Sequence, residues 1–325
     1  MKIITIGDLI DTYIRIKQKG ISSVLYKIGL NKINKIKNNW NENKNISGFW
    51  HIPLIMEHWN TIIAGNTNIN YPKYFCQKYL TNQQNKLLSI GSGTGFYERE
   101  FAKEECFSEI VGIELSENRV KYSEKIALEN NLNIKYINQN FYEIDFKNEK
   151  FDVILFNSSL HHFDNIEIFL SKYIKPLLTE NGFLVICEYI GKNRVYIPNF
   201  QLKKINEALK TIPKRYRIYT GTSNYKRKVY SPGLIRMKLN DPSEAIDSES
   251  ILPALHKHFH IIEEKQLGMN LLMPLMRGIA YNFITPDDET KQILNTLLEA
   301  DTDFTKEHKI SDFVFGVYQR THNTE

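Results

Sequence analysis

A glycine-rich turn after a short apolar run constrains the fold more than any other feature of the sequence. The apolar run Leu87–Ile90 leads into Gly91, Gly93 and Gly95, and Phe96 then opens a stretch with helical spacing. Glycines let the backbone turn sharply and approach a ligand closely, and the free N–H groups at a helix start favour a phosphate or a carboxylate. The pattern therefore predicts a ligand-binding turn between a strand and a helix, although a tight turn without a ligand has the same appearance.

Short apolar runs alternate with helical stretches through the middle of the chain. The candidate strands are Leu87–Ile90, Ile110–Ile113, Ile134–Ile137, Phe151–Phe156 and Phe183–Ile186. The candidate helices are Phe96–Glu105, Glu117–Asn130 and Ile166–Leu178. This order is typical of βαβ units, whose right-handed crossovers leave the strands parallel. The sequence therefore predicts an α/β fold with a doubly wound, Rossmann-like sheet.

The spacing of the glycines bears on the cofactor. Dinucleotide-binding turns follow the pattern G-x-G-x-x-G, which would place the third glycine at Phe96. In this chain the third glycine comes one residue earlier, at Gly95. Glu114 ends the apolar run Ile110–Ile113, and a carboxylate at that place can accept hydrogen bonds from both hydroxyls of a ribose. NAD enzymes share this acid, so Glu114 alone does not decide between the cofactors.

The turn resembles motif I of the class I S-adenosylmethionine (SAM)-dependent methyltransferases, and three later segments follow the order of that family. The first is Asn138–Phe141, where the family has Asp near the adenine. The second is Phe151–Phe163, which is similar to the family's segment containing Leu-His-His after strand four. The third is Pro176–Ile186, which is similar to the family's turn before strand five. The resemblance implies a methyltransferase with SAM as its cofactor. It further implies cofactor contacts from Gly91, Ser92, Gly93, Gly95, Glu114, Leu115, Asn140, Phe141 and Asn157.

Two positions depart from the pattern of that family. The Asp that commonly lies two residues before the first glycine is Ser89 here, and Asn140 replaces the usual Asp after strand three. Each change removes a charge but keeps a side chain that forms hydrogen bonds. We therefore expect weakened rather than abolished cofactor binding, and a SAM-binding subunit without turnover stays an alternative.

The resemblance continues in the C-terminal half of the chain. Four segments of this chain resemble a group of bacterial small-molecule or glycan methyltransferases. They are Glu188–Gly191 with Arg194, Asp241–Ala245, Gly268–Leu272 and Ile279–Phe283. The resemblance implies that these segments build the acceptor pocket, in which Tyr189 and Arg194 would orient the acceptor. The expected acceptor is a hydroxyl group, or an amine, of a small metabolite or a glycan.

The resemblance and the hydrophobic pattern together divide the chain into five segments. These are a basic helical arm at 1–48, aromatic cap helices at 49–85, a SAM-binding core at 86–188, a substrate-side annex or lid at 189–258, and the last two core strands with inserted helices at 259–325. The late strands are expected at Phe259–Glu263 and Asp312–Tyr318. In the resulting seven-stranded sheet, Asp312–Tyr318 should run antiparallel between strand five and Phe259–Glu263. The cap and the annex should enclose the acceptor.

Candidate bases lie just after strands four and five, where open α/β sheets bind their ligands. Methyl transfer from a sulfonium is an in-line displacement that needs an oriented acceptor and, for a hydroxyl acceptor, a group that removes its proton. The candidates are His161, His162 and Glu188. One of the two adjacent histidines should face the cleft while the other packs on the fold, and we favour His162 as the base. Glu188 would be its partner or a hydrogen-bond acceptor for the substrate.

Positive charge is concentrated near the N-terminus. The chain has a net charge of +5, whereas residues 1–48 hold nine basic and three acidic side chains, so that the remaining residues sum to −1. Helical spacing predicts two short helices in this arm, at 9–14 and 24–28, before an Asn-rich linker at 38–45. The near-neutral core argues against a nucleic-acid partner. An RNA or protein methyltransferase that docks through the basic arm stays an alternative.

Other classes of protein fit the sequence poorly. No run reaches the roughly 18 apolar residues of a membrane span, and the N-terminus, which carries Asp8 and Asp11, lacks a signal-peptide cleavage site. Three widely spaced cysteines form neither a disulfide framework nor a metal-binding pair, which favours a cytoplasmic location. Strand four is not followed by the Asn/Asp-Pro-Pro-Tyr/Phe sequence of enzymes that methylate base nitrogens. We expect no metal ion in the site, and the sequence leaves the oligomeric state open.

Overall fold

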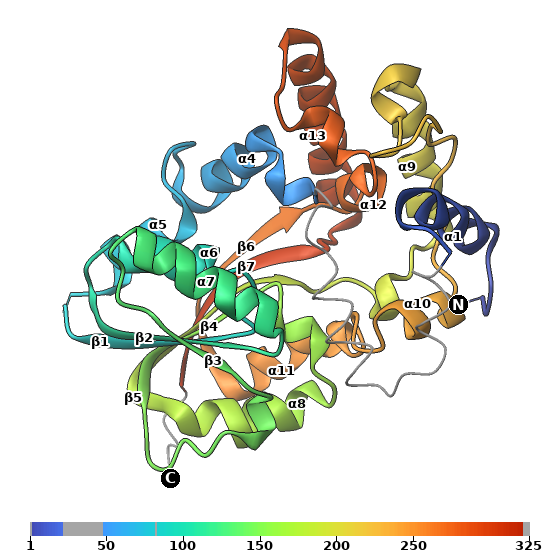
Figure 1. Ribbon diagram of the computed structural model, residues 1–325. Helices are drawn as coiled ribbons and strands as arrows, with labels where there is room; N and C mark the ends of the chain where they lie inside the picture. Colours follow the sequence, from blue (N-terminus) through green and yellow to red (C-terminus); the bar gives the residue numbers. More distant parts are fainter. Residues whose placement is uncertain (1, 22–47, 82, 321–325) are drawn as a thin grey trace. The chain divides into compact units, whose positions relative to one another are not determined.

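The computed structural model describes residues 2–21, 48–81 and 83–320 (Figure 1). The chain forms two compact units. One, here named the helical unit, comprises Met1–Trp59, Gly191–Glu244 and Leu267–Phe313. The other, here named the sheet unit, comprises Asn60–Ile190, Ala245–Gln266 and Val314–Glu325.

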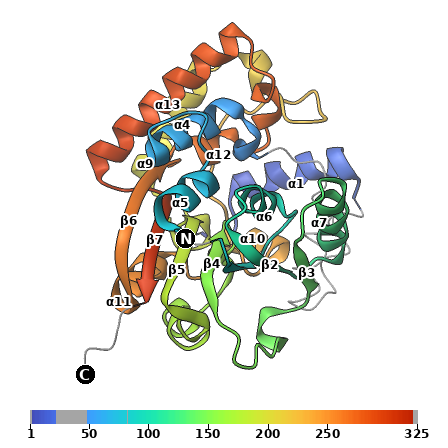
Figure 2. The same ribbon diagram turned by 90° about the vertical axis from the view of Figure 1, so that its left-hand side faces the viewer.

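A seven-stranded sheet forms the centre of the sheet unit. Its strands are β1 (Asn85–Ile90), β2 (Phe107–Glu114), β3 (Lys135–Asn138), β4 (Phe151–Asn157), β5 (Leu178–Tyr189), β6 (Phe259–Gly268) and β7 (Phe313–Arg320). They follow the order β3-β2-β1-β4-β5-β7-β6, which Figure 2 shows from β6 at its left to β3 at its right. The predicted doubly wound, seven-stranded sheet is therefore confirmed.

The first five strands pair in parallel, as the alternation of strands and helices predicts. Leu88 of β1 pairs with Val111 of β2 on one side and with Ile154 of β4 on the other. β3 extends the sheet beyond β2, and β5 extends it beyond β4. The direction of winding thus reverses between β1 and β4. Open α/β sheets bind their ligands at the carboxyl ends of strands at such a switch point.

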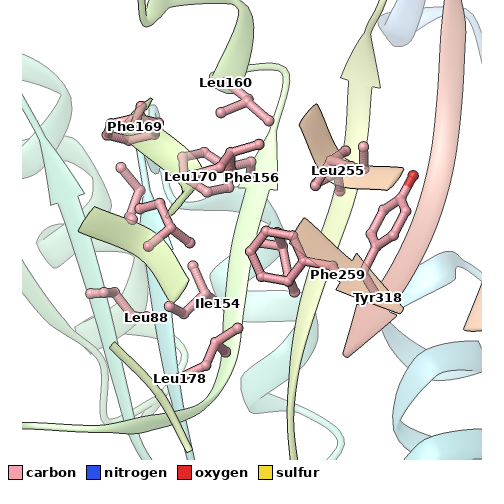
Figure 3. Close-up of a cluster of buried hydrophobic side chains, with 14 of the residues drawn as sticks. Leu88, Ile154, Phe156, Leu160, Phe169, Leu170, Leu178, Leu255, Phe259 and Tyr318 are labelled. Carbon is pink, nitrogen blue, oxygen red and sulfur yellow. The ribbon is translucent and has the colours of Figure 1, made fainter. Parts of the chain in front are cut away.

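The two late strands lie where they were expected. β7 lies between β5 and β6, and Figure 3 shows it running opposite to β5. β6 continues to Gly268, beyond the predicted end at Glu263. It is an edge strand that pairs on one side only, so polar residues such as Glu264 and Gln266 are tolerated in it. A search for apolar runs therefore ends this strand too early.

Helices cover both faces of the sheet (Figure 1). α5 (Tyr71–Tyr79), α6 (Phe96–Ala102) and α7 (Glu117–Glu129) lie on one face, and α8 (Ile166–Ile168) and α11 (Ile251–His258) lie on the other. The unit also contains the 3-10 turns η3 (Phe141–Glu143), η4 (Leu160–His162) and η9 (Ser248–Ser250). α6 begins after Gly95, and α7 begins after Ser116, whose side chain caps it by accepting a hydrogen bond from the backbone N–H of Arg119.

The helical stretch predicted over Ile166–Leu178 is present up to Leu177, but it consists of three kinds of helical turn. α8 gives way to a π-helical turn, η5 (Phe169–Ile174), and then to a 3-10 turn, η6 (Lys175–Leu177), while Leu178 already begins β5. Pro176 lies within η6, and its ring nitrogen has no hydrogen to donate to a carbonyl one turn earlier, so the α-helical hydrogen-bond pattern is not continued through this residue. The apolar periodicity of this segment continues into the strand and hides the boundary.

An apolar cluster holds the sheet to the helices on one of its faces (Figure 3). Leu88 and Ile154 come from neighbouring strands, Phe169 and Leu170 from η5, and Leu255 from α11, and all are at most 1% exposed. Burying a side chain of this size contributes about 1.5–3 kcal/mol. The cluster therefore fixes β1 and β4, the two strands whose carboxyl ends carry the turn and the histidines.

The helical unit begins with α1 (Ile6–Lys19), the first of the two helices predicted in the arm. The second predicted helix and the Asn-rich linker lie outside the described residues. The other elements are η2 (Phe49–His51), α4 (Pro53–Ala64), η7 (Asn193–Val195), α9 (Asn199–Thr211), η8 (Lys214–Arg217), α10 (Leu234–Asn240), α12 (Leu272–Met276), η10 (Ala280–Phe283) and α13 (Asp288–His308). Across the ranges that the structure describes, no helix is both long and apolar enough to span a bilayer.

Candidate functional site

The glycine turn joins β1 to α6 at the switch point of the sheet. Gly91 has a φ of 76°, and a Cβ atom at this residue would lie 2.6 Å from the Cβ of Ser159, so only glycine fits. Gly93 has a φ of 59°, but a Cβ there would meet a single described atom within 4 Å, the Nη1 of Arg119 at 3.7 Å. The turn is therefore closed toward the loop after β4 and open over Gly93. A ligand can approach the backbone closely at that point.

Glu114 lies at the end of β2, directly beside the open part of the turn. One oxygen of its carboxylate accepts a hydrogen bond from the N–H of Gly93 at 2.9 Å, and the other accepts one from the N–H of Ser116 at 2.7 Å. Burial raises the pKa of this carboxyl, while Arg119 and the N–H donors oppose the rise. Each oxygen keeps a lone pair for a further donor. The arrangement fits a ligand with two neighbouring hydroxyls, as the ribose of SAM has.

The segment after β3 offers fewer side chains for cofactor contacts than the resemblance implies. Asn140 caps η3, accepting a hydrogen bond from the N–H of Tyr142 at 3.3 Å. The ring of Phe141 is buried and packs edge-on against Phe169, with ring centroids 5.5 Å apart. Leu115, after β2, is half-buried. The Phe141 ring thus belongs to the core, and the predicted adenine contacts of this segment stay predictions.

Asn157 ends β4 and is reached by a tyrosine that the sequence did not single out. The hydroxyl of Tyr71, in α5, donates a hydrogen bond to the Oδ1 of Asn157 at 3.0 Å. The ring of Tyr71 stacks on that of Tyr97, in α6, with centroids 4.9 Å apart. The available signals were the concentration of aromatic residues before β1 and the position of Tyr97 two residues after the last glycine. Neither shows that the two rings meet at the end of β4.

Glu188, at the carboxyl end of β5, holds the loop that follows β4. It is completely buried, and one of its oxygens accepts hydrogen bonds from the N–H groups of Ser159 at 2.7 Å and Leu160 at 2.6 Å. The other oxygen accepts one from the N–H of Tyr189 at 2.7 Å and lies 2.5 Å from the Nδ1 of His161. The carboxylate therefore orders both the start of η4 and the imidazole of His161.

The two histidines differ in their surroundings. The Nδ1 of His161 faces the carboxylate, so its Nε2 is left as the nitrogen that can accept a proton. His162 is half-buried, and its ring centroid lies 4.2 Å from that of His161. Glu188 thus pairs with His161, whereas the sequence favoured His162 as the base. The identity of the base stays a prediction, and the geometry favours His161.

The loop between β4 and η4 has a strained backbone at Ser158, whose φ is 49°. Its N–H donates a hydrogen bond to the carbonyl of Cys187 at 2.9 Å, and the next residue, Ser159, donates its hydroxyl to the carbonyl of Ile90 at 2.6 Å. A non-glycine residue persists in this conformation only when its surroundings determine it. These bonds link β4 to β1 and β5 at the carboxyl edge of the sheet.

The two predicted acceptor-binding residues belong to different units. Tyr189 is buried in the sheet unit, with its ring centroid 6.0 Å from that of His161. Arg194 belongs to the helical unit, where its Nη1 donates hydrogen bonds to the carbonyls of Pro242 at 2.7 Å and Glu244 at 3.2 Å. Burial lowers the pKa of this guanidinium. Arg194 thus links its own segment to residues 242–244. Acceptor binding by Tyr189 and by Arg194 stays a prediction.

Comparisons with known proteins identify the family and the fold. A model of a methyltransferase domain family matches residues 81–247. Carboxy-S-adenosyl-L-methionine synthase of Nautilia profundicola is 24% identical over 162 residues, which are 49% of this chain and 63% of that protein. The chain therefore matches less than two thirds of the length of this relative.

A solved structure shares the fold. Geranyl diphosphate C-methyltransferase of Streptomyces coelicolor A3(2), in complex with Mg2+, geranyl diphosphate and S-adenosyl-L-homocysteine, superimposes with a TM-score of 0.51. The match covers 90% of this chain and 99% of that one at 12% sequence identity. At this identity the likeness concerns the arrangement of helices and strands alone.

Proposed function

Because the chain belongs to the class I SAM-dependent methyltransferases, we propose that it methylates a hydroxyl group of a small metabolite or a glycan. The observation that carries this proposal is the buried pair of His161 and Glu188 at the carboxyl ends of β4 and β5. A hydroxyl must lose its proton as it is methylated, whereas a neutral amine can attack without a base. An imidazole held at this place can act as the general base that a hydroxyl acceptor needs.

SAM would supply a methyl group bound to a positively charged sulfonium sulfur. After transfer of the methyl group, the rest of the cofactor is neutral S-adenosyl-L-homocysteine (SAH). In the proposed reaction the acceptor oxygen forms a bond to the methyl carbon while the bond from carbon to sulfur breaks. The Nε2 of His161 accepts the hydroxyl proton and later releases it to solvent. Glu188 holds the Nδ1–H of the same ring, and its negative charge stabilises the imidazolium that forms.

The remaining residues of the turn hold and orient the cofactor in this proposal. Glu114 accepts hydrogen bonds from the ribose hydroxyls, and the open backbone at Gly93 lets the ligand approach. Asn157 is positioned by Tyr71 at the end of β4, the strand next to β1, whose carboxyl end carries the turn. The cofactor thereby lies across the switch point between β1 and β4.

Product identification tests this proposal. The purified full-length chain is incubated with SAM carrying an isotopically labelled methyl group and with fractionated extract of the source cells, and labelled products are analysed by mass spectrometry. We expect a labelled O-methyl group on a small molecule or an oligosaccharide. Label found on RNA or protein would transfer the proposal to a macromolecular acceptor, and label on nitrogen would remove the need for a base.

A further inference from the structure

Glu98, in the first turn of α6, is a buried carboxyl group with an unsatisfied oxygen. Its side chain is 1% exposed. One carboxyl oxygen accepts a hydrogen bond from the hydroxyl of Ser89, in β1. The other, Oε2, has no hydrogen-bond partner among the described residues. Buried polar atoms without partners are rare in folded proteins, and each one calls for a physical reason.

Neither protonation state of Glu98 satisfies this oxygen in the free protein. The ionised carboxylate lacks a donor for Oε2, and a protonated acid, whose Oε1–H can be donated to the Ser89 hydroxyl, still leaves Oε2 without a donor. Burial raises the pKa of Glu98 to about 7, and the hydrogen bond from Ser89 opposes the rise. Glu98 is therefore partly ionised and partly protonated near neutral pH. In both states the unsatisfied oxygen costs free energy, and a ligand that donates a hydrogen bond to it would remove this cost.

The surroundings of Glu98 contain little positive charge. The ionisable groups that act on it or respond to it are Arg99, Glu114, Tyr71, Tyr97 and Tyr136. Of these only Arg99 is cationic, and its guanidinium donates a hydrogen bond to the carbonyl of Thr94 at 2.8 Å. In the part of the chain that the structure describes, no ion pair joins Glu98 to a lysine or an arginine. The missing partner is a hydrogen-bond donor, and a cationic donor would also compensate the charge of the carboxylate.

The position of Glu98 identifies that donor. Ser89 lies two residues before Gly91, at the position where the family commonly has Asp, and Glu98 brings a carboxyl group back to this place from the next helix. SAM carries three kinds of donor, namely the ribose hydroxyls, the adenine amino group and the ammonium of its methionine part. The hydroxyls are assigned to Glu114, and only the ammonium is charged.

We propose that Glu98 is a cofactor-binding residue whose Oε2 accepts a hydrogen bond from the ammonium of SAM, while Ser89 positions its carboxylate. The lost acid of the glycine motif is thus replaced by one from α6. SAM and SAH share this ammonium, so both gain the contact, whereas 5′-methylthioadenosine keeps the adenosine and lacks the ammonium. The two ligands separate this contact from every contact to the ribose and the adenine.

Calorimetry with SAH and 5′-methylthioadenosine tests the proposal without any acceptor, and therefore independently of the proposed O-methylation. Glu98→Gln should weaken SAH binding by about 10-fold to 100-fold, as expected for a lost hydrogen bond between charged groups. Binding of 5′-methylthioadenosine should stay within about twofold of the wild type. Glu114→Gln is the matched control, because it should weaken both ligands. Equal weakening of both ligands by Glu98→Gln, or no weakening, would overturn the proposal.

Moving the carboxylate from residue 98 to residue 89 by substitution supplies a second test. The double variant Ser89→Asp/Glu98→Gln returns the carboxylate to the strand, and it should recover at least about tenfold of the lost SAH affinity. Failure of this rescue in a folded protein would mean that Glu98 shapes the turn without contacting the ligand.

Proton release by the wild-type protein decides the matter if the variants do not fold. Binding of an ammonium holds Glu98 ionised, so SAH binding near pH 7 should release protons, and SAH affinity should fall as the pH drops below about 7. Calorimetry in buffers of different ionisation enthalpy measures this release. 5′-Methylthioadenosine should release fewer protons, and equal release by the two ligands would contradict the assignment.

Discussion

At the scale of single residues, the site depends on carboxylates whose partners are fixed before any ligand arrives. Glu188 accepts three backbone N–H bonds and faces His161, and Glu114 accepts two N–H bonds at the turn. Such preorganisation spares the reacting groups the cost of reorientation during the reaction. It also makes the roles of neighbouring residues separable by substitution.

The two histidines give the most direct residue-scale prediction. His161→Ala should lower kcat by about 10²–10⁴-fold with a hydroxyl acceptor, because it removes the general base that Glu188 positions. SAM affinity should change little. His162→Ala is the matched control and should retain most of the activity. Turnover measured with the true acceptor at saturating SAM decides between them, and the opposite ranking would return the role of base to His162.

The ribose contact gives a second residue-scale prediction. Glu114→Ala should weaken SAH binding by about 1.5–3 kcal/mol, the range for a hydrogen bond to a charged group. Glu117→Ala, an exposed acid three residues further along the chain, serves as the control and should leave affinity unchanged. Calorimetry with SAH measures both variants. Wild-type affinity in the Glu114 variant would remove this carboxylate from the cofactor site.

At the scale of elements, α12 in the helical unit shows how tertiary contacts sustain a helix that is too short to be stable alone. Asp301 accepts hydrogen bonds from the N–H groups of Leu271 and Leu272 at the start of this five-residue helix. Lys226 donates to the carbonyls of Pro274 and Leu275, each at 2.9 Å, near its end. An acid at the N-terminus and a base at the C-terminus complement the helix dipole.

Removal of the lysine tests this arrangement. Lys226→Met should lower the free energy of unfolding by about 1–3 kcal/mol, because it leaves buried carbonyls without a donor. Lys228→Met, at an exposed neighbour, should have almost no effect. Urea denaturation followed by circular dichroism compares the two variants. Equal stability of both would mean that the buried ammonium does not stabilise α12.

At the scale of the whole molecule, three buried carboxyl groups influence how stability depends on pH. Burial raises the pKa of Glu98 to about 7, that of Asp301 to about 6 and that of Asp312 to about 7. The folded chain therefore holds protons at pH values where the unfolded chain has released them. By linkage, the contribution of these groups to stability increases as the pH falls from about 7 toward about 4.

We therefore expect the free energy of unfolding to be larger at pH 6 than at pH 8. Each unit of pKa shift that is crossed is worth about 1.4 kcal/mol, and the buried Lys226, whose pKa is lowered to about 7, offsets part of the sum, which leaves a difference of about 1–3 kcal/mol. Asp312→Asn should reduce this difference, whereas Asp303→Asn, at an exposed acid of α13, should not. Urea denaturation at the two pH values measures it. A stability that rises steadily from pH 6 to pH 8 would show that these carboxyls are ionised in the folded chain at pH 6.

The predictions that were confirmed concern features encoded by neighbouring residues. The turn at Gly91–Gly95, the alternation of strands and helices, and the late strands at Phe259 and Phe313 all appear where their local patterns placed them. Periodicity and glycine spacing are effective because strand, turn and helix are decided over a few residues. The same locality explains why apolar spacing at Ile166–Leu178 did not distinguish the α, π and 3-10 turns and why it included Leu178, which begins β5.

The sequence by itself determined the strands and the turn, since these follow from short-range patterns, and its resemblance to a known family identified the class of cofactor. Only the tertiary structure decided which side chains act together. Glu188 lies 27 residues from His161, and Lys226 lies 48 residues from Pro274. Even Ser89 and Glu98, nine residues apart, meet only because the turn folds α6 back against β1. Pairings of this kind depend on how strands and helices pack, and residue types along the chain carry no direct record of them.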